Sequence, residues 1–235
     1  MMSQTASPHL PRKSWGCLIS TLLLVLAVLG LVVYGAITLG IALGWMRQPA
    51  SRVAIFFIGS ALGELAAFAL LTWLLHRRGS RLCALGWRQP TRWSALSLGL
   101  SIAIVYSAYT ALNNPSVGHH LLEFSLLKLV AVVAVVVAGV VEETIFRGYV
   151  MTTLGRMGYG LVVQVLLSGL FFALAHFYAF ANPLSLLVVQ GFTFLLGVAL
   201  AMTYVVGKRS LTPVIISHTL IDMTIEPWLL LRFFQ

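Results

Sequence analysis

Long uncharged stretches divide this chain into segments that predict membrane-spanning helices. The first stretch runs from Trp15 to Trp45 without a charged residue. Because an α-helix rises about 1.5 Å per residue, this stretch is longer than a hydrocarbon core of about 30 Å, and we expect a helix that tilts, bends or protrudes. It is also too long for the apolar region of a signal peptide, so we interpret it as a retained helix.

Six further apolar segments follow, separated by short polar or glycine-containing breaks. They cover about 53–75, 94–112, 122 to the Val-Glu-Glu-Thr-Ile-Phe-Arg sequence, 160–178, 184–206 and 211–225. Pro213 suits the first turn of the last helix, and Pro227 opens a short apolar tail that could form an eighth, incomplete span. The pattern therefore predicts an all-α, polytopic transmembrane bundle of seven to eight helices. We divide it into an N-terminal tail at 1–14, N-terminal helices at 15–121, a helical core at 122–226 and a tail at 227–235.

Composition supports a lipid environment. Hydrophobic residues make up 60% of the 235 positions and charged residues 9%, and the mean hydropathy is +0.97. A soluble domain usually has about a quarter charged residues. Too few charges are present to cover a water-facing surface, so we expect membrane lipid around most of the chain.

The basic residues indicate an orientation rather than a nucleic-acid partner. The net charge is +9, but no basic face with interleaved aromatic residues occurs, so we expect no nucleic-acid binding. With the N-terminus in the cytoplasm, the arginines of 77–92 lie inside, while Arg47 and Arg52 lie outside, as the positive-inside rule predicts. The short loops are typical of a bacterial protein, so we expect a multi-pass protein of the plasma or bacterial inner membrane.

Two adjacent carboxylates, Glu142 and Glu143, follow a long apolar run. Because ionised groups in hydrocarbon are costly, such residues face a bundle interior or a water-filled cavity and are usually functional. Arg147 lies four residues beyond Glu143, on the same helix face, in the order that favours an ion pair. Glu142 lacks that partner and is the better general base, whereas Glu143 is the better structural anchor. For Glu64, inside the second span, we expect pairing with a polar group on a neighbouring helix.

Two histidines follow on later helices. His176 ends an aromatic run, while His218 and Asp222 are four residues apart and share one helix face. A His–Asp pair can orient an imidazole, bind a metal or present hydrogen bonds to a developing oxyanion. Counting about 1.5 Å per residue from the expected helix ends, these groups and Glu142 overlap in depth in the inner half to the middle of the membrane. Three helices could therefore present their polar groups to one buried cavity.

Three short motifs resemble those of a known family. Glu142-Glu143-Thr-Ile-Phe-Arg147 resembles the EExxxR motif of the CPBP family, the CAAX-protease-like (Abi) and bacteriocin-processing intramembrane peptidases. Phe172-Ala-Leu-Ala-His176 resembles its FxxxH motif, and His218-Thr-Leu-Ile-Asp222 its HxxxN/D motif. The resemblance covers about 125–225, whereas the N-terminal third is similar only as generic membrane helices.

This resemblance implies a glutamate-dependent endopeptidase that needs no metal or other cofactor. By this resemblance Glu142, assisted by His176, activates a water that attacks a peptide carbonyl. Glu143 and Arg147 would hold the site together. The substrate would be a peptide or a membrane protein. A prenylated C-terminal motif is the eukaryotic family precedent, and a pheromone or bacteriocin precursor is an alternative.

The same resemblance assigns His218 and Asp222 to stabilisation of the oxyanion. Members that process prenylated proteins have asparagine at the position of Asp222. An asparagine amide donates a hydrogen bond, whereas an ionised aspartate does not. Asp222 would instead orient His218 or carry a proton.

Other classes of function fit the same residues. Two glutamates, two histidines and Asp222 are plausible ligands for a metal-dependent enzyme. A non-catalytic scaffold, a bacteriocin self-immunity protein or a proton relay could also use buried polar groups. An intramembrane aspartyl protease needs two aspartates, and Asp222 is the only one. A site-2 metalloprotease needs HExxH, but Phe177 and Tyr178 follow His176.

Overall fold

The computed structural model describes residues 14–87, 89–113, 115, 124–176 and 183–233. Within these residues all regular structure is helical, which confirms the predicted all-α class. Five of the described helices are long and apolar enough to cross a membrane. The predicted N-terminal tail, apart from Ser14, and most of the break at 113–121 lie outside the described residues.

The helices follow one another with short connections. They are α1 (Trp15–Ala42), α2 (Pro49–Arg77), α3 (Trp93–Asn113), α5 (Leu126–Glu143), α6 (Met151–Arg156), α7 (Leu161–Ala175), α8 (Pro183–Val206) and α9 (Thr212–Phe233). A π-helical segment, Thr144–Val150, joins α5 to α6 without a break. Short 3₁₀ turns at Trp45–Arg47 and Leu82–Leu85 follow α1 and α2.

Local sequence accounts for several helix ends. The Ser14 hydroxyl accepts a hydrogen bond from the Cys17 amide at 3.3 Å and caps α1. Ser125 caps α5 in the same way through the Lys128 amide at 3.1 Å. Such caps satisfy amide groups that the first helical turn leaves unpaired. Pro49 opens α2, where its missing N–H costs nothing.

Two predicted spans differ from the observed helices. The expected break at Pro227 is absent, because α9 continues through that position to Phe233. Residues 227–233 therefore extend the last helix and form no separate eighth span. The predicted span at 160–178 is shorter in the structure, where α7 ends at Ala175 and His176 follows as its C-terminal cap. The remainder of that expected span, 177–178, lies outside the described residues.

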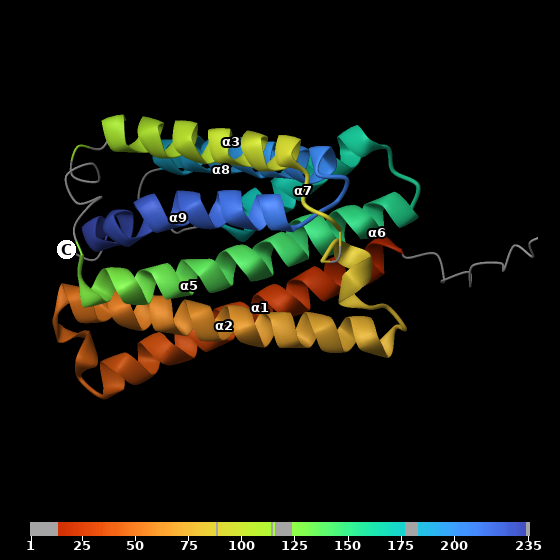
Figure 1. The fold of residues 1–235 in the computed structure, drawn as a ribbon. Coiled ribbons are helices and arrows are strands. Elements are labelled where there is room, and N and C mark those ends of the chain that lie inside the picture. Colours follow the sequence, from red (N-terminus) through yellow and green to blue (C-terminus); the bar gives the residue numbers. More distant parts are fainter. Residues whose placement is uncertain (1–13, 88, 114, 116–123, 177–182, 234–235) are drawn as a thin grey trace, which may run out of the picture.

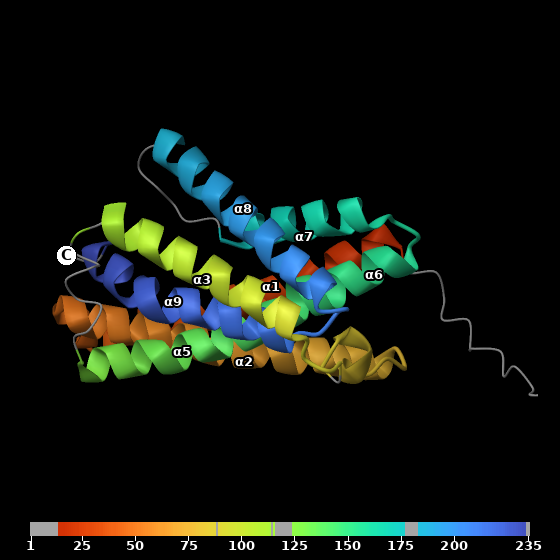
Figure 2. The same cartoon turned by 45° about the horizontal axis from the view of Figure 1, so that its top comes forward.

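The bundle is arranged around α5. This helix packs along α2 on one side and along α9 on the other, while α1 packs on α2 and α3 packs on α9. Figure 1 shows α5 between the α1–α2 pair and the group of α3, α8 and α9. The helix α8 packs along α7 and tilts away from the bundle toward its own N-terminal end, as Figure 2 shows.

Small residues let the helices that carry polar groups approach closely. A Cβ atom added at Gly139 of α5 would meet Thr219 Oγ1 of α9 at 2.6 Å. A Cβ added at Gly197 of α8 would meet the Cα of Gly169 in α7 at 2.9 Å. Close backbone contact of this kind is typical of helix packing in membranes. These contacts fix α5, α7, α8 and α9 at distances that allow their polar side chains to meet.

Candidate functional site

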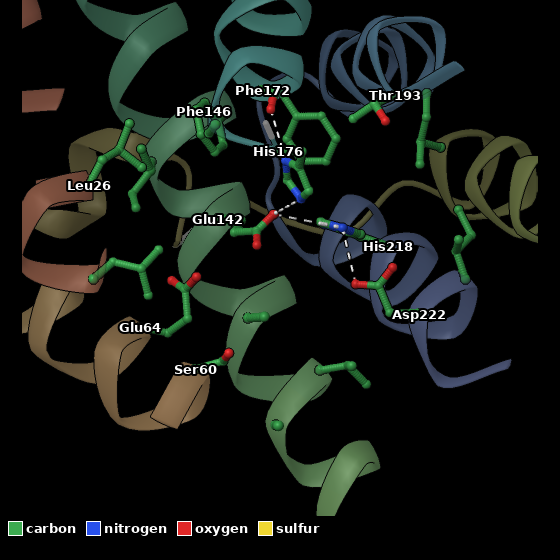
Figure 3. Close-up of a pocket in the computed structure, with 18 of the residues that line it drawn as sticks. Leu26, Ser60, Glu64, Glu142, Phe146, Phe172, His176, Thr193, His218 and Asp222 are labelled. Carbon is green, nitrogen blue, oxygen red and sulfur yellow. Dashed lines mark hydrogen bonds and ion pairs between the residues drawn. The ribbon is translucent and has the colours of Figure 1, made fainter. Parts of the chain in front are cut away.

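A cavity of about 330 Å³ lies inside the bundle and is lined by residues of seven helices. Four of the six predicted site residues line it, namely Glu142, His176, His218 and Asp222, and Figure 3 shows them grouped together. Glu143 and Arg147 lie behind this group, and both side chains are fully buried.

The cavity extends from the site residues along the bundle. On α2 it is lined by residues between Phe56 and Glu64, in the first half of that helix. On α3 it is lined by Tyr106, in the second half. The cavity therefore extends from the middle of the bundle toward the end opposite the arginine-rich segment 77–92. The overlap of the site residues in the inner half to the middle of the membrane stays a prediction. The helices α1, α2 and α3, which that prediction did not include, contribute much of the cavity wall.

Glu142 faces both histidines. Its Oε2 atom lies 3.4 Å from His176 Nε2 and 3.9 Å from His218 Nε2. Both distances exceed those of a good direct hydrogen bond. Catalytic hydrogen bonds are often long without substrate, and a water molecule can bridge groups at such spacing. The Glu142 carboxylate is therefore in a position to share a water with a histidine.

Contacts at the C-terminal end of α7 orient His176. Its Nδ1 atom lies 2.8 Å from the carbonyl oxygen of Phe172. Since a carbonyl only accepts, Nδ1 carries the hydrogen and Nε2 faces Glu142. The Gln190 amide donates to the carbonyl oxygen of His176 at 2.9 Å and ties this end of α7 to α8. The histidine is thus held at a helix end, by backbone and side chain together.

His218 connects two groups that the sequence predicts as separate pairs. Its Nδ1 atom lies 2.7 Å from Glu143 Oε1, which also accepts a hydrogen bond from Arg147 at 2.7 Å. Nδ1 therefore donates to Glu143, and Nε2 faces the cavity. Asp222 Oδ2 lies 3.2 Å from that same Nε2. The Glu143–Arg147 pair thus orients His218 directly, which local spacing alone does not reveal.

Arg147 and Phe172 form the wall behind the histidines. Arg147 also donates to the carbonyl oxygen of Gly197 at 2.9 Å, and its guanidinium carbon lies 4.5 Å from the centre of the Phe172 ring. That ring lies 4.4 Å from the ring of His176 and 5.4 Å from that of His218, measured between centres. Phe172 therefore contacts all three side chains and fixes the spacing of the two imidazoles.

The π-helical segment Thr144–Val150 was not predicted from the sequence. All seven of its side chains are buried. Single π-helical turns inside α-helices frequently occur at functional sites. Here the wider turn lies directly after Glu143 and contains Arg147, so it shapes the backbone from which the ion pair projects.

Glu64 of α2 lies in the wall of the same cavity. Its Oε2 atom has no hydrogen-bond partner among the described residues, and its side chain lines the cavity with Glu142. The pairing of Glu64 with a polar group on a neighbouring helix therefore stays a prediction, and Oε2 takes no part in such a pair among the described residues. Ser60 lies four residues earlier on α2 and also lines the cavity. This pair of polar residues, one turn apart, is the sequence feature that indicates a cavity-facing position for Glu64.

The glutamates, the histidines and Asp222 of the site are residue types that can bind a metal ion. Within the described part of the chain, no group of three or more His, Cys, Asp or Glu side chains is arranged to hold a metal ion. Cys17 and Cys83 are both free thiols.

Comparison with known proteins adds a family match. Residues 124–224 match the family model described as type II CAAX prenyl endopeptidase, Rce1-like. This match confirms the resemblance that the three motifs indicate, and it covers α5, α6, α7 and α8 and the first half of α9. No curated protein and no solved structure matches the chain.

Proposed function

We propose that this chain, whose residues 124–224 match the Rce1-like family model of type II CAAX prenyl endopeptidases, hydrolyses peptide bonds of membrane-associated substrates inside the bilayer. The observation that carries the proposal is the position of Glu142 Oε2, within 3.9 Å of the Nε2 atoms of both histidines and facing one cavity. A general base beside an oriented imidazole is the arrangement that water activation requires.

The proposed reaction begins with a water between Glu142 and His176. Glu142 takes a proton from the water while the water oxygen attacks the peptide carbonyl carbon. The electron pair of the carbonyl double bond moves onto the carbonyl oxygen. When both ring nitrogens of His218 carry hydrogen, its Nε2–H stabilises that oxyanion. The carbon–nitrogen bond then breaks, and the leaving amine takes the proton from Glu142. One water is consumed, and a carboxyl and an amino terminus are formed.

The remaining residues support this chemistry by position. Glu143 and Arg147 hold His218 through the 2.7 Å contact between Nδ1 and Glu143 Oε1. The sequence indicates a plasma or bacterial inner membrane location, and we propose peptide or membrane-protein substrates there. We further propose that water activation needs no metal, because Glu142 and His176 supply the base and its partner.

The decisive experiment compares purified wild-type protein with Glu142→Gln, using peptide or membrane-protein substrates and measuring cleavage by mass spectrometry. Glutamine keeps the shape but cannot accept the proton, and we expect activity to fall about 10²- to 10⁴-fold. Gly191→Ala is a suitable control, because a Cβ at that exposed position meets nothing within 4 Å. Full activity of Glu142→Gln would refute the mechanism.

Metal independence is tested on the same protein with a chelator. We expect cleavage to continue at its original rate. Loss of cleavage that added Zn²⁺ restores would favour a metalloenzyme instead.

A further inference from the structure

Glu64 is a buried carboxyl group that the proposed reaction does not use. It belongs to α2, outside the matched residues 124–224. Its side chain is only 4% exposed, and its Oε2 atom has no hydrogen-bond partner among the described residues. A buried polar group costs free energy unless a partner satisfies it. An acceptor of this kind, facing a cavity, indicates a ligand that supplies the missing donor.

The position of Glu64 follows from how α2 packs. Gly63 faces α1, where an added Cβ would meet Leu29 Cδ1 at 2.7 Å and the Leu29 carbonyl oxygen at 2.9 Å. The next residue on a helix points about 100° away. Tight contact at Gly63 therefore turns Glu64, and Ser60 one turn earlier, toward the cavity, as Figure 3 shows.

The charges around the cavity favour a cation. Apart from Tyr106, the ionisable groups among the described lining residues are three carboxyls, Glu64, Glu142 and Asp222, and two histidines. No lysine or arginine is among them. Arg147, which lies behind the wall, is already bonded to Glu143 at 2.7 Å. A substrate that brings a positive charge would therefore be favoured over one that brings a negative charge.

The wall around Glu64 is apolar. Leu26, Leu29, Phe56 and Phe57 line the part of the cavity that α1 and α2 contribute. A side chain that fits this part needs an aliphatic stem and a donor at its end. Lysine has this form, since its methylene stem packs on apolar surface while its ammonium group makes polar contacts.

We propose that Glu64 forms a subsite for a lysine side chain of the peptide substrate. This inference rests on the proposed endopeptidase function. The stem packs on the α1–α2 wall, and the ammonium group donates a hydrogen bond to Glu64. In the view of Figure 3 the Glu142 carboxylate lies between Glu64 and the two histidines. The lysine therefore lies beside the scissile bond, on the side away from His218.

The test uses matched peptides in which each position around the scissile bond carries either lysine or norleucine. Norleucine keeps the stem and lacks the ammonium group. We expect wild-type protein to prefer lysine at one position. In Glu64→Gln the lysine-to-norleucine ratio of kcat/KM should fall about ten- to one-hundred-fold, mainly through KM, because a charge-assisted hydrogen bond is lost. Leu62→Ala, on an exposed part of α2, should leave the ratio as it is.

Two results would overturn the subsite. One is an unchanged ratio in Glu64→Gln. The other is an equal fall of kcat for both peptides, which would assign Glu64 to the reaction or to the fold rather than to lysine. A binding measurement separates this inference from the function on which it rests. Fluorescence anisotropy should show about tenfold weaker binding of the labelled lysine peptide to Glu142→Gln/Glu64→Gln than to Glu142→Gln. That difference is measurable whether or not wild-type protein cleaves, and its absence contradicts the subsite.

Discussion

At the scale of single residues, Asp222 lies where the proposed mechanism would place the oxyanion. Its Oδ2 atom lies 3.2 Å from His218 Nε2, the same nitrogen that faces the cavity. An ionised aspartate there competes with the developing oxyanion for the Nε2–H donor. An asparagine would leave that nitrogen available and add an amide donor of its own.

We therefore expect Asp222→Asn to retain or increase kcat relative to wild type, with an increase of up to about tenfold. Asp222→Leu, which removes both oxygens and leaves a similar volume, also frees the Nε2–H of His218 but adds no donor, so its kcat should lie between those of wild type and Asp222→Asn. All three rates are measured with saturating peptide on purified protein. A loss of activity in both variants would mean that the carboxylate itself is needed, for example to orient His218.

Arg147 is a second residue whose removal has a defined cost. Its side chain is fully buried and bonds both Glu143 and the Gly197 carbonyl oxygen. Arg147→Leu would leave His218 as the remaining partner of the buried Glu143 charge, and removing one partner of a buried ion pair typically costs about 3–5 kcal/mol. We expect a clear fall in the thermal unfolding temperature of the detergent-solubilised protein.

The matched double variant Glu143→Leu/Arg147→Leu removes both charges together. It should recover part of that stability, because no buried charge remains unpaired, but it should stay inactive because His218 loses its support. Equal unfolding temperatures for the single and double variants would contradict the ion-pair account.

Local spacing predicts some of these contacts and misses others. The pairs Glu143–Arg147 and His218–Asp222 are each four residues apart, so helix geometry alone predicts them. The contact between His218 and Glu143 joins positions 75 apart in sequence and depends on how α9 is rotated against α5. Periodicity cannot supply that rotation. The surroundings of Glu64 depend in the same way on tertiary packing, here that of α2.

At the scale of helices, the crossing of α7 and α8 is the most sensitive contact. Gly197→Ala would place a Cβ 2.9 Å from the Cα of Gly169, a backbone atom with little room to move. We expect α7 and α8 to separate slightly, at a cost of about 1–3 kcal/mol. The unfolding temperature should fall, and cleavage should fall with it, because His176 and the acceptor of Arg147 both move.

The matched control lies on the same helix. Gly191 is exposed, and a Cβ there meets nothing within 4 Å. Gly191→Ala should therefore be neutral or slightly stabilising, since alanine favours helix over glycine by up to about 1 kcal/mol. Equal losses in the two variants would show that the Gly169–Gly197 contact is not the cause.

Helix limits were predictable where polar residues mark them and less so elsewhere. Charges and prolines fixed the ends of α2, α3 and α8 to within a few residues. Pro227 did not end α9, since neighbouring groups can satisfy the backbone of a membrane helix at proline. The π-helical segment after Glu143 has no composition that distinguishes it from an α-helix. Its origin lies in tertiary packing.

At the scale of the whole molecule, the orientation in the membrane can be tested. The arginine-rich connection after α2 should face the cytoplasm, and the turn between α1 and α2 should face outward. In a background without Cys17 and Cys83, we expect a membrane-impermeant maleimide to label Gln48→Cys in intact cells. Ala84→Cys should be labelled only after the membrane is permeabilised. The opposite labelling pattern would reverse the orientation.

The two parts of the chain are joined at the arginine-rich end. The Tyr204 hydroxyl donates to the Leu85 carbonyl oxygen at 3.0 Å, and the Ser210 hydroxyl donates to that of Gln89 at 3.2 Å. Gly86 has a φ of +105° there, and a Cβ would collide with the Arg209 carbonyl oxygen. These contacts attach the N-terminal part of the chain to the helices of the matched region 124–224. The helices α1, α2 and α3 thus complete the cavity.

The same end of the bundle is closely packed. The buried segment Thr144–Val150 leads away from the cavity, and at Gly148 it meets Leu85 and Leu211 at 3.1 and 3.7 Å from an added Cβ. An enzyme that consumes water in the bilayer must admit water from somewhere. A polar passage from one face to the other would let protons leak and dissipate the gradient that a cell maintains. Under the proposed function, the close packing of Gly148 against Leu85 and Leu211 would close this end, so water would reach the cavity from the opposite end only and hydrolysis would not discharge the gradient.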